Sequence, residues 1–509
     1  MKTTFDLVES PWIPCIQGDG TTVEVGLRQA LVSAHELREL HGESPLVTAA
    51  LHRLLLAVLH RIFGPASAGE WHALWQEDQW DESRVGAYLE RWRHRFDLFH
   101  PERPFYQAAD HRVKPKSVAT LVYEVASGNN PTLFDHHTKD AGLTLAPAPA
   151  ARLLVGAQAF GLAGLSGLPQ KFTDAPCARG VIFLVQGDSL FETLALNLLR
   201  YPDDTVMVHQ GDDLPAWEMD DPFTPQRSRP RGYLDYLTWQ NRRVLLPPRP
   251  PNGDLAIEEM TVAPGLRLDR EVRDPMKHYR QDKKRGPLVT RFREHRALWR
   301  DSAALLQLRD AAYIPPRAFD WLSELVDRGY LDKTQTRRYL GLGMAADQAR
   351  VDFYRAERMP LPLAYLRGQE LVGYLQEAVD MAERAGRQLW GATRSLAILL
   401  LSPGSDLEGG RRPAREDLDS MTNQWAVDRR YWSRLEIPFL ETLQTLPGEP
   451  EQSLDAWRST LLRAARGAFG AVADNLGHDP RALKAVVRAS GQLAAGLAKA
   501  LPRDERAGI

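Results

Sequence analysis

Three short segments of this sequence contain the side chains that metal binding requires. Asp135–His137 offers a carboxylate and two imidazoles, and further candidate ligands precede it at His100, Asp110 and His111. His478–Asp479 has the order of a metal-hydrolase pair, but an aspartate before a proline is also typical of a helix N-cap. A solvated loop is the favoured explanation of Asp135–His137. We therefore expect no bound metal and no other cofactor.

The glycine-rich segment Gly164, Leu165, Ser166, Gly167 only partly matches a nucleophile elbow. The last glycine of that motif is missing, and the nearest strand is expected after the serine rather than before it. The phosphate-loop pattern G-x-x-x-x-G-K-[ST] does not occur in the sequence. We expect no catalytic residue, and so no enzyme.

Several loops have the composition of a nucleic-acid-binding surface. Glycines at 161, 164 and 167 would let the backbone approach a groove closely. Phe134 lies in a polar loop where an aromatic ring could stack on a base. Arg267, Arg270 and the run Lys277–Arg285 carry charge suited to phosphate, and Gln348 follows a glycine-led segment. Taken one at a time, these features are more typical of a turn, an apolar anchor, a solvated face and a surface side chain.

Composition describes an ordinary globular chain of more than one domain. The sequence has 509 residues, of which 43% are apolar and 26% charged, and its formal net charge is only -2. Nucleic-acid contacts would therefore come from local basic patches. The only two cysteines exclude a four-cysteine zinc site and favour a reducing compartment, so we expect a cytoplasmic protein. Charges interrupt the apolar stretch 45–64, which predicts an amphipathic core helix and no membrane contact.

Periodicity predicts mixed secondary structure followed by helices. Residues 27–99 have helical spacing, residues 180–187 form a buried strand bounded by glycines, and two strands are expected within 233–246 and 257–268. After residue 358 the pattern is helical throughout. We predict helices over 360–401, over 415–446 with a break at Pro438, over 453–477 with Ser453 as cap, and over 480–501 after Asp479. In the last helix an apolar stripe is predicted to face the core: Leu483, Val486, Val487, Leu493, Leu497 and Leu501.

These elements predict an α+β fold with two domains. A large mixed α/β domain over residues 1–358 carries the candidate loops, and residues 359–509 form an antiparallel four-helix bundle.

Two motifs and this domain order resemble one known family. Residues 5–14, Phe-Asp-Leu-Val-Glu-Ser-Pro-Trp-Ile-Pro, are similar to the N-terminal signature of the large, CasA-type subunit of the type I-E CRISPR Cascade complex. Residues 99–107, with the pattern His-Pro-x-x-Pro-Phe-x-Gln, are similar to its second signature. The resemblance extends over nearly the whole chain.

The resemblance implies a non-catalytic subunit of an RNA-guided antiviral surveillance complex. Such a subunit recognises the protospacer-adjacent motif in double-stranded DNA, initiates strand separation and helps to recruit the helicase-nuclease. The implied partners are target DNA, guide RNA within the complex, other Cascade subunits and that helicase-nuclease. The resemblance also implies a set of DNA-binding residues: Gly164, Leu165, Ser166 and Gly167 as a glycine loop, Arg270 or Arg267 as a basic finger, Gln348 with Ala349 as a wedge, and Phe134 in a first loop.

Some residues depart from the family pattern, and two alternatives stay open. Some relatives hold zinc with four cysteines, which this chain lacks, and Asp347 stands where a relative has asparagine. An acid beside DNA is repelled by phosphate, so this position is expected to turn away. One alternative is a metal-dependent hydrolase that uses the loop histidines. The other is a structural, RNA-binding scaffold without duplex DNA contact.

Overall fold

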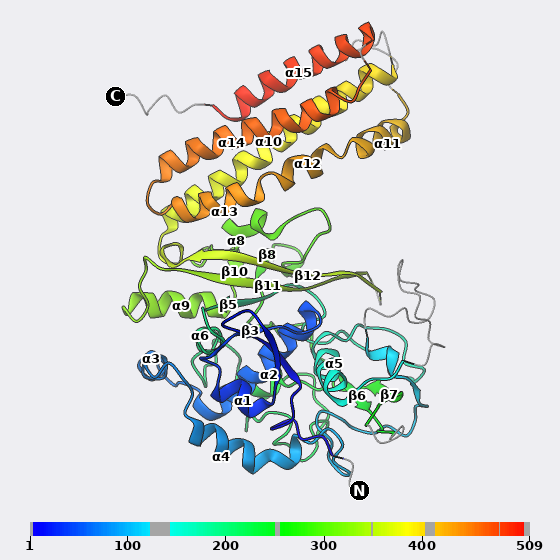
Figure 1. Cartoon of the computed structure of the whole chain (residues 1–509), viewed down its shortest axis with the longest axis vertical. Helices are drawn as coiled ribbons and strands as arrows, with labels where there is room; N and C mark the ends of the chain where they lie inside the picture. The colour runs from blue at the N-terminus through cyan, green and yellow to red at the C-terminus, as the bar shows by residue number, and fades with distance from the viewer. Residues whose placement is uncertain are drawn as a thin grey trace. The chain divides into compact units, whose positions relative to one another are not determined.

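The chain packs into two compact units in the computed structural model, which describes residues 4–122, 143–249, 255–347, 350–402, 413–477 and 479–502 (Figure 1). Unit 1 consists of Met1–Arg296, Asp310–Lys333 and Arg337–Arg358. Unit 2 consists of Ala297–Arg309, Thr334–Thr336 and Met359–Ile509. Two short segments of unit 2 therefore come from the part of the sequence that the predicted division placed in the first domain.

Unit 1 combines helices with small antiparallel sheets, in agreement with the predicted α+β class. Its described helices are α1 (Leu27–Val32), α2 (Pro45–Phe63), α3 (Ala68–Gln76), α4 (Glu82–Trp92), α5 (Pro147–Phe160), α6 (Leu190–Leu196), α7 (Tyr233–Leu237) and α9 (Arg317–Asp327), with 3-10 turns η1 (Arg93–Arg95) and η2 (Val118–Leu121). The described strands form three-stranded sheets in the orders β2-β1-β3, β10-β8-β9, β12-β11-β5 and β4-β7-β6.

The strands have the following bounds: β1 (Ile13–Gln17), β2 (Thr22–Val25), β3 (Leu37–Leu40), β4 (Lys116–Ser117), β5 (Ile182–Gln186), β6 (Arg242–Leu245), β7 (Glu259–Pro264), β8 (Tyr279–Asp282), β9 (Gly286–Val289), β10 (Tyr313–Ile314), β11 (Thr336–Asp347) and β12 (Arg350–Pro362). Strand β5 confirms the predicted buried strand, since all five of its residues are buried. It pairs antiparallel with β11, with Leu184 opposite Leu340.

Helix α2 lies in the core of unit 1. Ser44 caps its N-terminus by accepting a hydrogen bond from the Val47 amide, and Pro45 occupies the first turn, where its missing N–H costs nothing. By length and composition this helix could span a membrane, but 83% of its most apolar window is buried inside the protein. It is a core helix, as predicted.

Two predictions for unit 1 were wrong in detail. Residues 37–40 form strand β3 and pair with β1, although the surrounding spacing predicted helix. Tyr233–Leu237 is helix α7, whereas β6 and β7 do form the predicted strand pair, with Val244 opposite Val262. Of the four residues of β3, Arg38 alone is exposed, because the strand is buried where it pairs with β1. This tertiary pairing outweighs the local helical pattern.

Both cysteines are buried in unit 1. Cys15 in β1 and Cys177 ahead of β5 are each 0% exposed. Burial raises the pKa of the Cys15 thiol to about 12 and that of the Cys177 thiol to about 11. Both are free thiols that behave as small apolar side chains.

Unit 2 is built mainly from helices. Its described elements are η4 (Leu298–Asp301), α8 (Ser302–Leu305), η5 (Leu363–Leu366), α10 (Gln369–Leu401), α11 (Arg415–Trp425), α12 (Val427–Ser433), α13 (Glu436–Thr445), α14 (Pro450–Ala473) and α15 (Pro480–Ala500). The long helix α10 packs against both α14 and α15 (Figure 1). The Trp299 ring, in η4, stacks on Phe439 at 4.4 Å and meets Trp457 edge-on, which explains why residues 297–309 belong to this unit.

The predicted helix over 415–446 is divided into α11, α12 and α13. The first break, which was not predicted, falls at Ala426, which has the left-handed φ of 49°. The second break, between Ser433 and Glu436, lies just ahead of Pro438, where a break was predicted. Pro438 is the third residue of α13, where its missing N–H breaks no intrahelical bond. The sequence offered no signal for a left-handed alanine, because this conformation is disfavoured for any residue with a Cβ.

The caps and faces of the last two helices were predicted only in part. Asp479 caps α15 and accepts from the amides of Arg481 and Ala482, as predicted. Ser453 is not the cap of α14, which begins at Pro450; its hydroxyl instead donates to Thr445 Oγ1. The predicted apolar stripe of α15 is wrong at Leu483 and Val487, which are 51% and 70% exposed. The face that packs inward is formed by residues mostly smaller than leucine: Ala482, Ala485, Ala489, Leu493 and Leu497.

Two buried histidines of α2 predict a dependence of stability on pH. His60 Nδ1 bonds the Leu56 carbonyl and His60 Nε2 accepts from the Leu199 amide, so the neutral ring satisfies both partners. Burial lowers the pKa of His60 and of His52 to about 4. The unfolded chain therefore binds protons that the folded chain does not between about pH 6.5 and 4, and stability falls as the pH falls through this window.

Glutamine in place of His60 can also donate to Leu56 and accept from Leu199, but it does not titrate. We therefore expect His60→Gln to reduce the slope of the unfolding free energy against pH, by an amount corresponding to up to about one proton. Urea unfolding of both proteins at pH 7 and pH 5 measures it. Comparison of the two proteins cancels the opposite contribution of Asp320, whose pKa burial raises to about 6. An equal slope in the wild type and the variant would contradict the assignment.

Candidate nucleic-acid interface

The glycine-containing loop follows directly from the end of α5. The Gly161 carbonyl accepts from the Ala175 amide at 2.7 Å, and the Ala159 carbonyl accepts from the Cys177 amide at the same distance. Gly164 and Phe172 face each other as an antiparallel bridge. Residues 161–175, here called the glycine loop, therefore leave the unit and return to it at nearly the same point.

At the tip of the glycine loop an apolar side chain faces solvent. The Ser166 hydroxyl accepts from the Leu168 amide at 3.0 Å and donates to the Gln170 carbonyl, so it braces the turn instead of standing free as a nucleophile. Gly167 has a φ of 77° with open space around it. Leu165 is 84% exposed. The turn thus holds a large apolar side chain in water at the tip of the loop.

Arg242, at the start of β6, holds the base of the glycine loop. Its guanidinium donates to the carbonyls of Leu162 at 2.7 Å and Thr173 at 3.0 Å, and lies over the Phe172 ring. A Cβ at Gly161 would lie 2.8 Å from Arg242 Nη2, so this position requires glycine. Arg242 thus binds both the outgoing and the returning segment of the glycine loop, which fixes the base of the loop.

Arg179 links the glycine loop to strand β11. It pairs with Asp174 at 2.9 Å, and its Nη1 donates to the Ala346 carbonyl at 2.7 Å. Asp174 in turn accepts from the Ala163 amide, inside the loop. Ala346, which accepts the hydrogen bond from Arg179 near the end of β11, therefore lies close to the base of the glycine loop. It is two residues before Gln348 in the sequence. Gln348 and Ala349 lie outside the described residues.

A second side chain, Asn241, joins the glycine loop to the basic turn Arg267–Arg273. Its Nδ2 lies 3.2 Å from Thr173 Oγ1 and 3.1 Å from the Leu266 carbonyl. Arg267 and Arg270 follow and are both exposed. The nearby carboxylates of Asp269 and Glu271 are held by Arg229. In the described part of the chain neither Arg267 nor Arg270 has a carboxylate partner, so both cations are available to an external anion.

The β8–β9 hairpin presents the exposed part of the predicted basic run. Asp282 Oδ1 accepts the amides of Lys284 and Arg285, each at 2.9 Å, and thereby shapes the tip. Lys283, Lys284 and Arg285 are exposed. Lys277 was wrongly included in this surface: it is 6% exposed, its Nζ donates to the Pro176 carbonyl at 2.6 Å, and burial lowers its pKa.

The glycine loop, β11 and the hairpin all border strand β5, and the basic turn is joined to the glycine loop through Asn241. The glycine loop leads into this strand, β11 pairs along one edge of it, and Lys277 bridges to Ile182 on the other edge. The Val181 amide donates to the Thr290 carbonyl, just after β9. The structure therefore brings the bases of the glycine loop, the basic turn, the hairpin and the end of β11 together.

Beneath this support lies a buried ion pair between α2 and the segment ahead of β8. Arg53 Nη1 is 3.2 Å from Asp274 Oδ2, and the side chains are 3% and 1% exposed. Asp274 Oδ1 accepts from the Met276 amide, and Asp274 Oδ2 is 3.9 Å from the Cys177 sulfur. Sequence reasoning missed Arg53, Asp274, Arg179, Asn241 and Arg242, because each acts alone and none belongs to a spaced motif.

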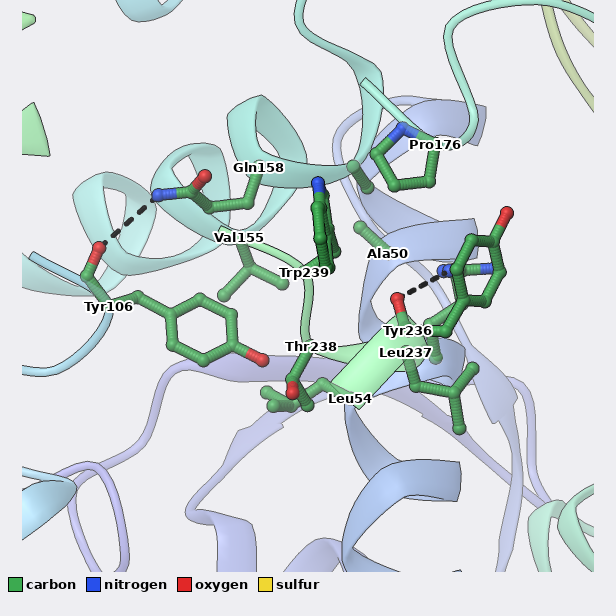
Figure 2. A pocket seen from close by; sticks show the side chains of 12 residues that line it. Ala50, Leu54, Tyr106, Val155, Gln158, Pro176, Tyr236, Leu237, Thr238 and Trp239 are labelled. Atoms are coloured by element: carbon green, nitrogen blue, oxygen red, sulfur yellow. Dashed lines mark hydrogen bonds between the residues drawn. The ribbon is translucent and has the colours of Figure 1, made fainter. Parts of the chain in front are cut away.

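A small cavity nearby is too small to be a ligand site. Figure 2 shows it between α2, α5 and α7, with Tyr106, Trp239 and Pro176 around it. Its volume is about 20 Å³, enough for about one water molecule.

Several predicted residues lie outside the described part of the chain. They are Phe134, Asp135–His137, His478, Gln348 and Ala349. Within the described residues no three His, Cys, Asp or Glu side chains come together in a way that would hold a metal ion. The candidate metal ligands that are described have other roles: His100 Nδ1 accepts from the Arg103 amide, and Asp110 pairs with Arg112.

Comparison with known proteins identifies the family. The family model described as CRISPR-associated protein Cse1 matches residues 6–468. The chain belongs to the CRISPR-associated Cse1 family. The CRISPR-associated protein CasA/Cse1 of Thermus thermophilus is 38% identical over 495 residues, which are 95% of each protein. The resemblance to the CasA-type large subunit of Cascade is thereby confirmed.

Solved structures agree with this membership of the Cse1 family. A crystal structure of CasA from Thermus thermophilus superimposes with a TM-score of 0.81 at 33% identity, covering 98% of this chain and 100% of that one. A chain of a CRISPR RNA-guided surveillance complex has the same fold, with a TM-score of 0.75 at 24% identity, covering 96% of this chain and 99% of that one.

The buried ion pair yields a prediction about stability. Asp274→Ala leaves Arg53 charged and uncompensated in the core, so the free energy of unfolding should fall by about 3–5 kcal/mol. Asp269→Ala, which breaks the more exposed pair with Arg229, is the matched control and should cost less than about 1 kcal/mol. Urea unfolding measures both variants, and hydrogen exchange at the Met276 amide reports whether the loss is local. An Asp274→Ala protein as stable as the control would contradict the role given to this pair.

Proposed function

We propose that this Cse1-family chain is the subunit of a type I-E Cascade complex that recognises the protospacer-adjacent motif in double-stranded DNA and begins strand separation. The observation that carries the proposal is the common support around β5. Around it the bases of the glycine loop, the basic turn with its exposed cations and the end of β11 lie together. A reader of duplex DNA requires such a combination of backbone, cation and wedge.

Each loop has a physical task in this proposal. The minor groove carries a degenerate donor and acceptor code, which suits recognition of several related motifs. Glycine backbone at 164 and 167 approaches base edges without side-chain clash. Arg270 or Arg267 anchors a phosphate, and insertion of Gln348 beside Ala349 offsets an unstacking cost of a few kcal/mol. Phe134, in the first loop, would stack on or wedge against a base. Sequence recognition beyond the motif is left to guide pairing.

The proposal includes an assembly of several partners in the cytoplasm. A relative with the same fold is part of an RNA-guided surveillance complex, which supports contacts with guide RNA and other Cascade subunits here. In this proposal α10, the α11–α13 row, α14 and α15 are the four rows of the predicted antiparallel bundle, and they contact neighbouring subunits. The assembled surface then helps to recruit the helicase-nuclease, which performs the cleavage that this subunit does not.

The two alternatives differ from this proposal in measurable ways. A metal-dependent hydrolase would bind a stoichiometric metal ion and cut nucleic acid as an isolated chain. A structural, RNA-binding scaffold would leave the duplex affinity of the complex unchanged when the loop cations are removed. Metal analysis with a nuclease assay tests the first, and salt-dependent duplex binding of the complex tests the second.

We expect Gln348→Ala and Arg270→Ala each to weaken binding of target duplex by the assembled complex. Loss of Arg270 removes one phosphate contact, so it should also lower the slope of log affinity against log salt by about one. Gel shifts at several salt concentrations measure both effects. Arg328→Ala, at an exposed arginine paired with Glu324 after α9, is the control. Unchanged binding by both test variants would remove the wedge and finger assignments.

Leu165 should influence which motif is accepted. Because this side chain is 84% exposed, Leu165→Ser should change the free energy of unfolding by no more than about 0.5 kcal/mol. Its apolar tip cannot accept a hydrogen bond from the guanine N2 amino group, which is the one donor in the minor groove. Serine can, so the variant should bind motifs with G·C pairs at the contacted step relatively better. Competition gel shifts with a panel of motifs measure this, and an unchanged ranking would contradict it.

A further inference from the structure

A pocket of about 300 Å³ lies in unit 1 beside the second signature segment, residues 99–107. The residues that matter for its chemistry are Arg95, Arg103, Tyr106, Trp217, Phe223 and Arg243. This volume is at the lower end of the range of small-molecule sites, about 300–1,000 Å³. None of these residues takes part in the proposed reading of DNA.

Arg95 is a buried cation, and the charge of Asp220 acts on it only from beyond ion-pair distance. Arg95 is 8% exposed, and its Nη2 donates to the Met219 carbonyl at 3.0 Å. Within the described residues no carboxylate lies within 4.0 Å of it. Burial, and then the neighbouring charge of Arg103, lower the pKa of Arg95. Since buried charges in proteins are normally paired, an anion in this pocket would supply what the chain does not.

Two further arginines line the same pocket. Arg103 pairs with Asp220 at 2.9 Å, but the side chain of Asp220 is 96% exposed, so this pair is weak and can exchange for a ligand. Arg243 places its guanidinium 3.9 Å from the centre of the Phe223 ring. One face of that guanidinium thereby lies on the Phe223 ring, and an arginine guanidinium can also stack on the flat ring of a base.

Three acidic residues also line the pocket, Glu102, Asp220 and Asp221, and none of them contacts Arg95. Asp220 offsets the charge of Arg95 only in part, from a longer distance. The Asp221 carboxylate is occupied by the Phe223 amide at 2.9 Å and the Thr224 hydroxyl at 2.6 Å. Glu102 is exposed and has no cationic partner among the described residues. Its charge would oppose an anionic ligand, which gives the experiment below a variant of opposite sign.

The wall of the pocket contains a strained backbone position. Tyr106 has a φ of 55°, an uncommon conformation for a bulky residue. It is held there because its ring stacks on Phe105 at 4.4 Å and its carbonyl accepts from Gln158 Nε2, as Figure 2 shows. Such backbone strain persists only where the surroundings impose it, and strained positions gather at functional sites. Tyr106 stands between this pocket and the small cavity of Figure 2.

We propose that this pocket binds a nucleotide, with Arg95 and Arg103 on its phosphate and Arg243 stacked on its base. Arginine binds phosphate oxygens through two parallel N–H groups, and three arginines meet in this pocket with a flat aromatic wall. The phosphate and base belong either to a free nucleotide or to the phosphorylated end of a strand. The site is independent of the loops around β5, so either assignment can fail without the other.

Calorimetric titration of the full chain with AMP, adenosine and inorganic phosphate tests the proposal. AMP should bind one to one with a Kd below about 1 mM, and adenosine and phosphate should each bind at least about tenfold more weakly. Short oligoribonucleotides with a 5′-phosphate or a 5′-hydroxyl identify the source. Phosphate-dependent binding of the oligonucleotide as tight as that of AMP indicates a strand end, and binding of AMP alone indicates a free nucleotide.

Three variants locate the binding and a fourth controls for it. Arg103→Gln and Arg243→Gln should each weaken AMP about tenfold, whereas Glu102→Gln should tighten it, a change that a structural role would not produce. Arg328→Gln, elsewhere in unit 1, should have no effect. Circular dichroism confirms that each variant is folded. Absence of AMP binding, equal affinity for AMP and inorganic phosphate, or insensitivity to all three pocket variants would overturn the proposal.

Discussion

The arrangement of unit 1 depends on one buried ion pair, between Arg53 of α2 and Asp274 ahead of β8. In the protein interior a charge without its partner costs several kcal/mol, so two segments that are distant in the sequence must fold against each other. Asp274 also faces Cys177, the residue on which the glycine loop returns. The pair therefore fixes the core helix, the end of the glycine loop and the start of the β8–β9 hairpin with respect to one another.

Above this pair, the loops of unit 1 have fixed bases and open tips. Arg242, Asn241 and Arg179 use their hydrogen bonds on backbone carbonyls and neighbouring side chains at the base of the glycine loop. The tips keep an exposed leucine and exposed cations. A surface that recognises a shape benefits from this division, because a fixed base removes much of the entropy that would be lost on binding. In the pocket beside Tyr106, the lining is likewise held in place by contacts within the protein before any ligand binds.

Much of the local structure could be predicted because its cause is local. Strand β5 is apolar and bounded by glycines, and Asp479–Pro480 is a typical N-cap sequence at the start of α15. What failed depends on distant partners. The burial of Lys277 requires the Pro176 carbonyl, which charge patterning cannot reveal. In the candidate site, the glycines of 161–167 were visible as a cluster, whereas Asn241 and Asp274 are single polar residues whose roles arise only when separate segments meet. Phe134, Gln348 and Ala349 remain predictions.

The state of the two thiols has a practical consequence for work on this protein. Both sulfurs are enclosed in the core, and burial disfavours the thiolate, which is the form that reacts with maleimides. A cysteine introduced at a solvent-facing position would therefore be the fast-reacting one without prior removal of the native pair. A fluorophore or spin probe could be attached to a chosen loop of the otherwise natural sequence, and its distance from a labelled duplex followed in real time.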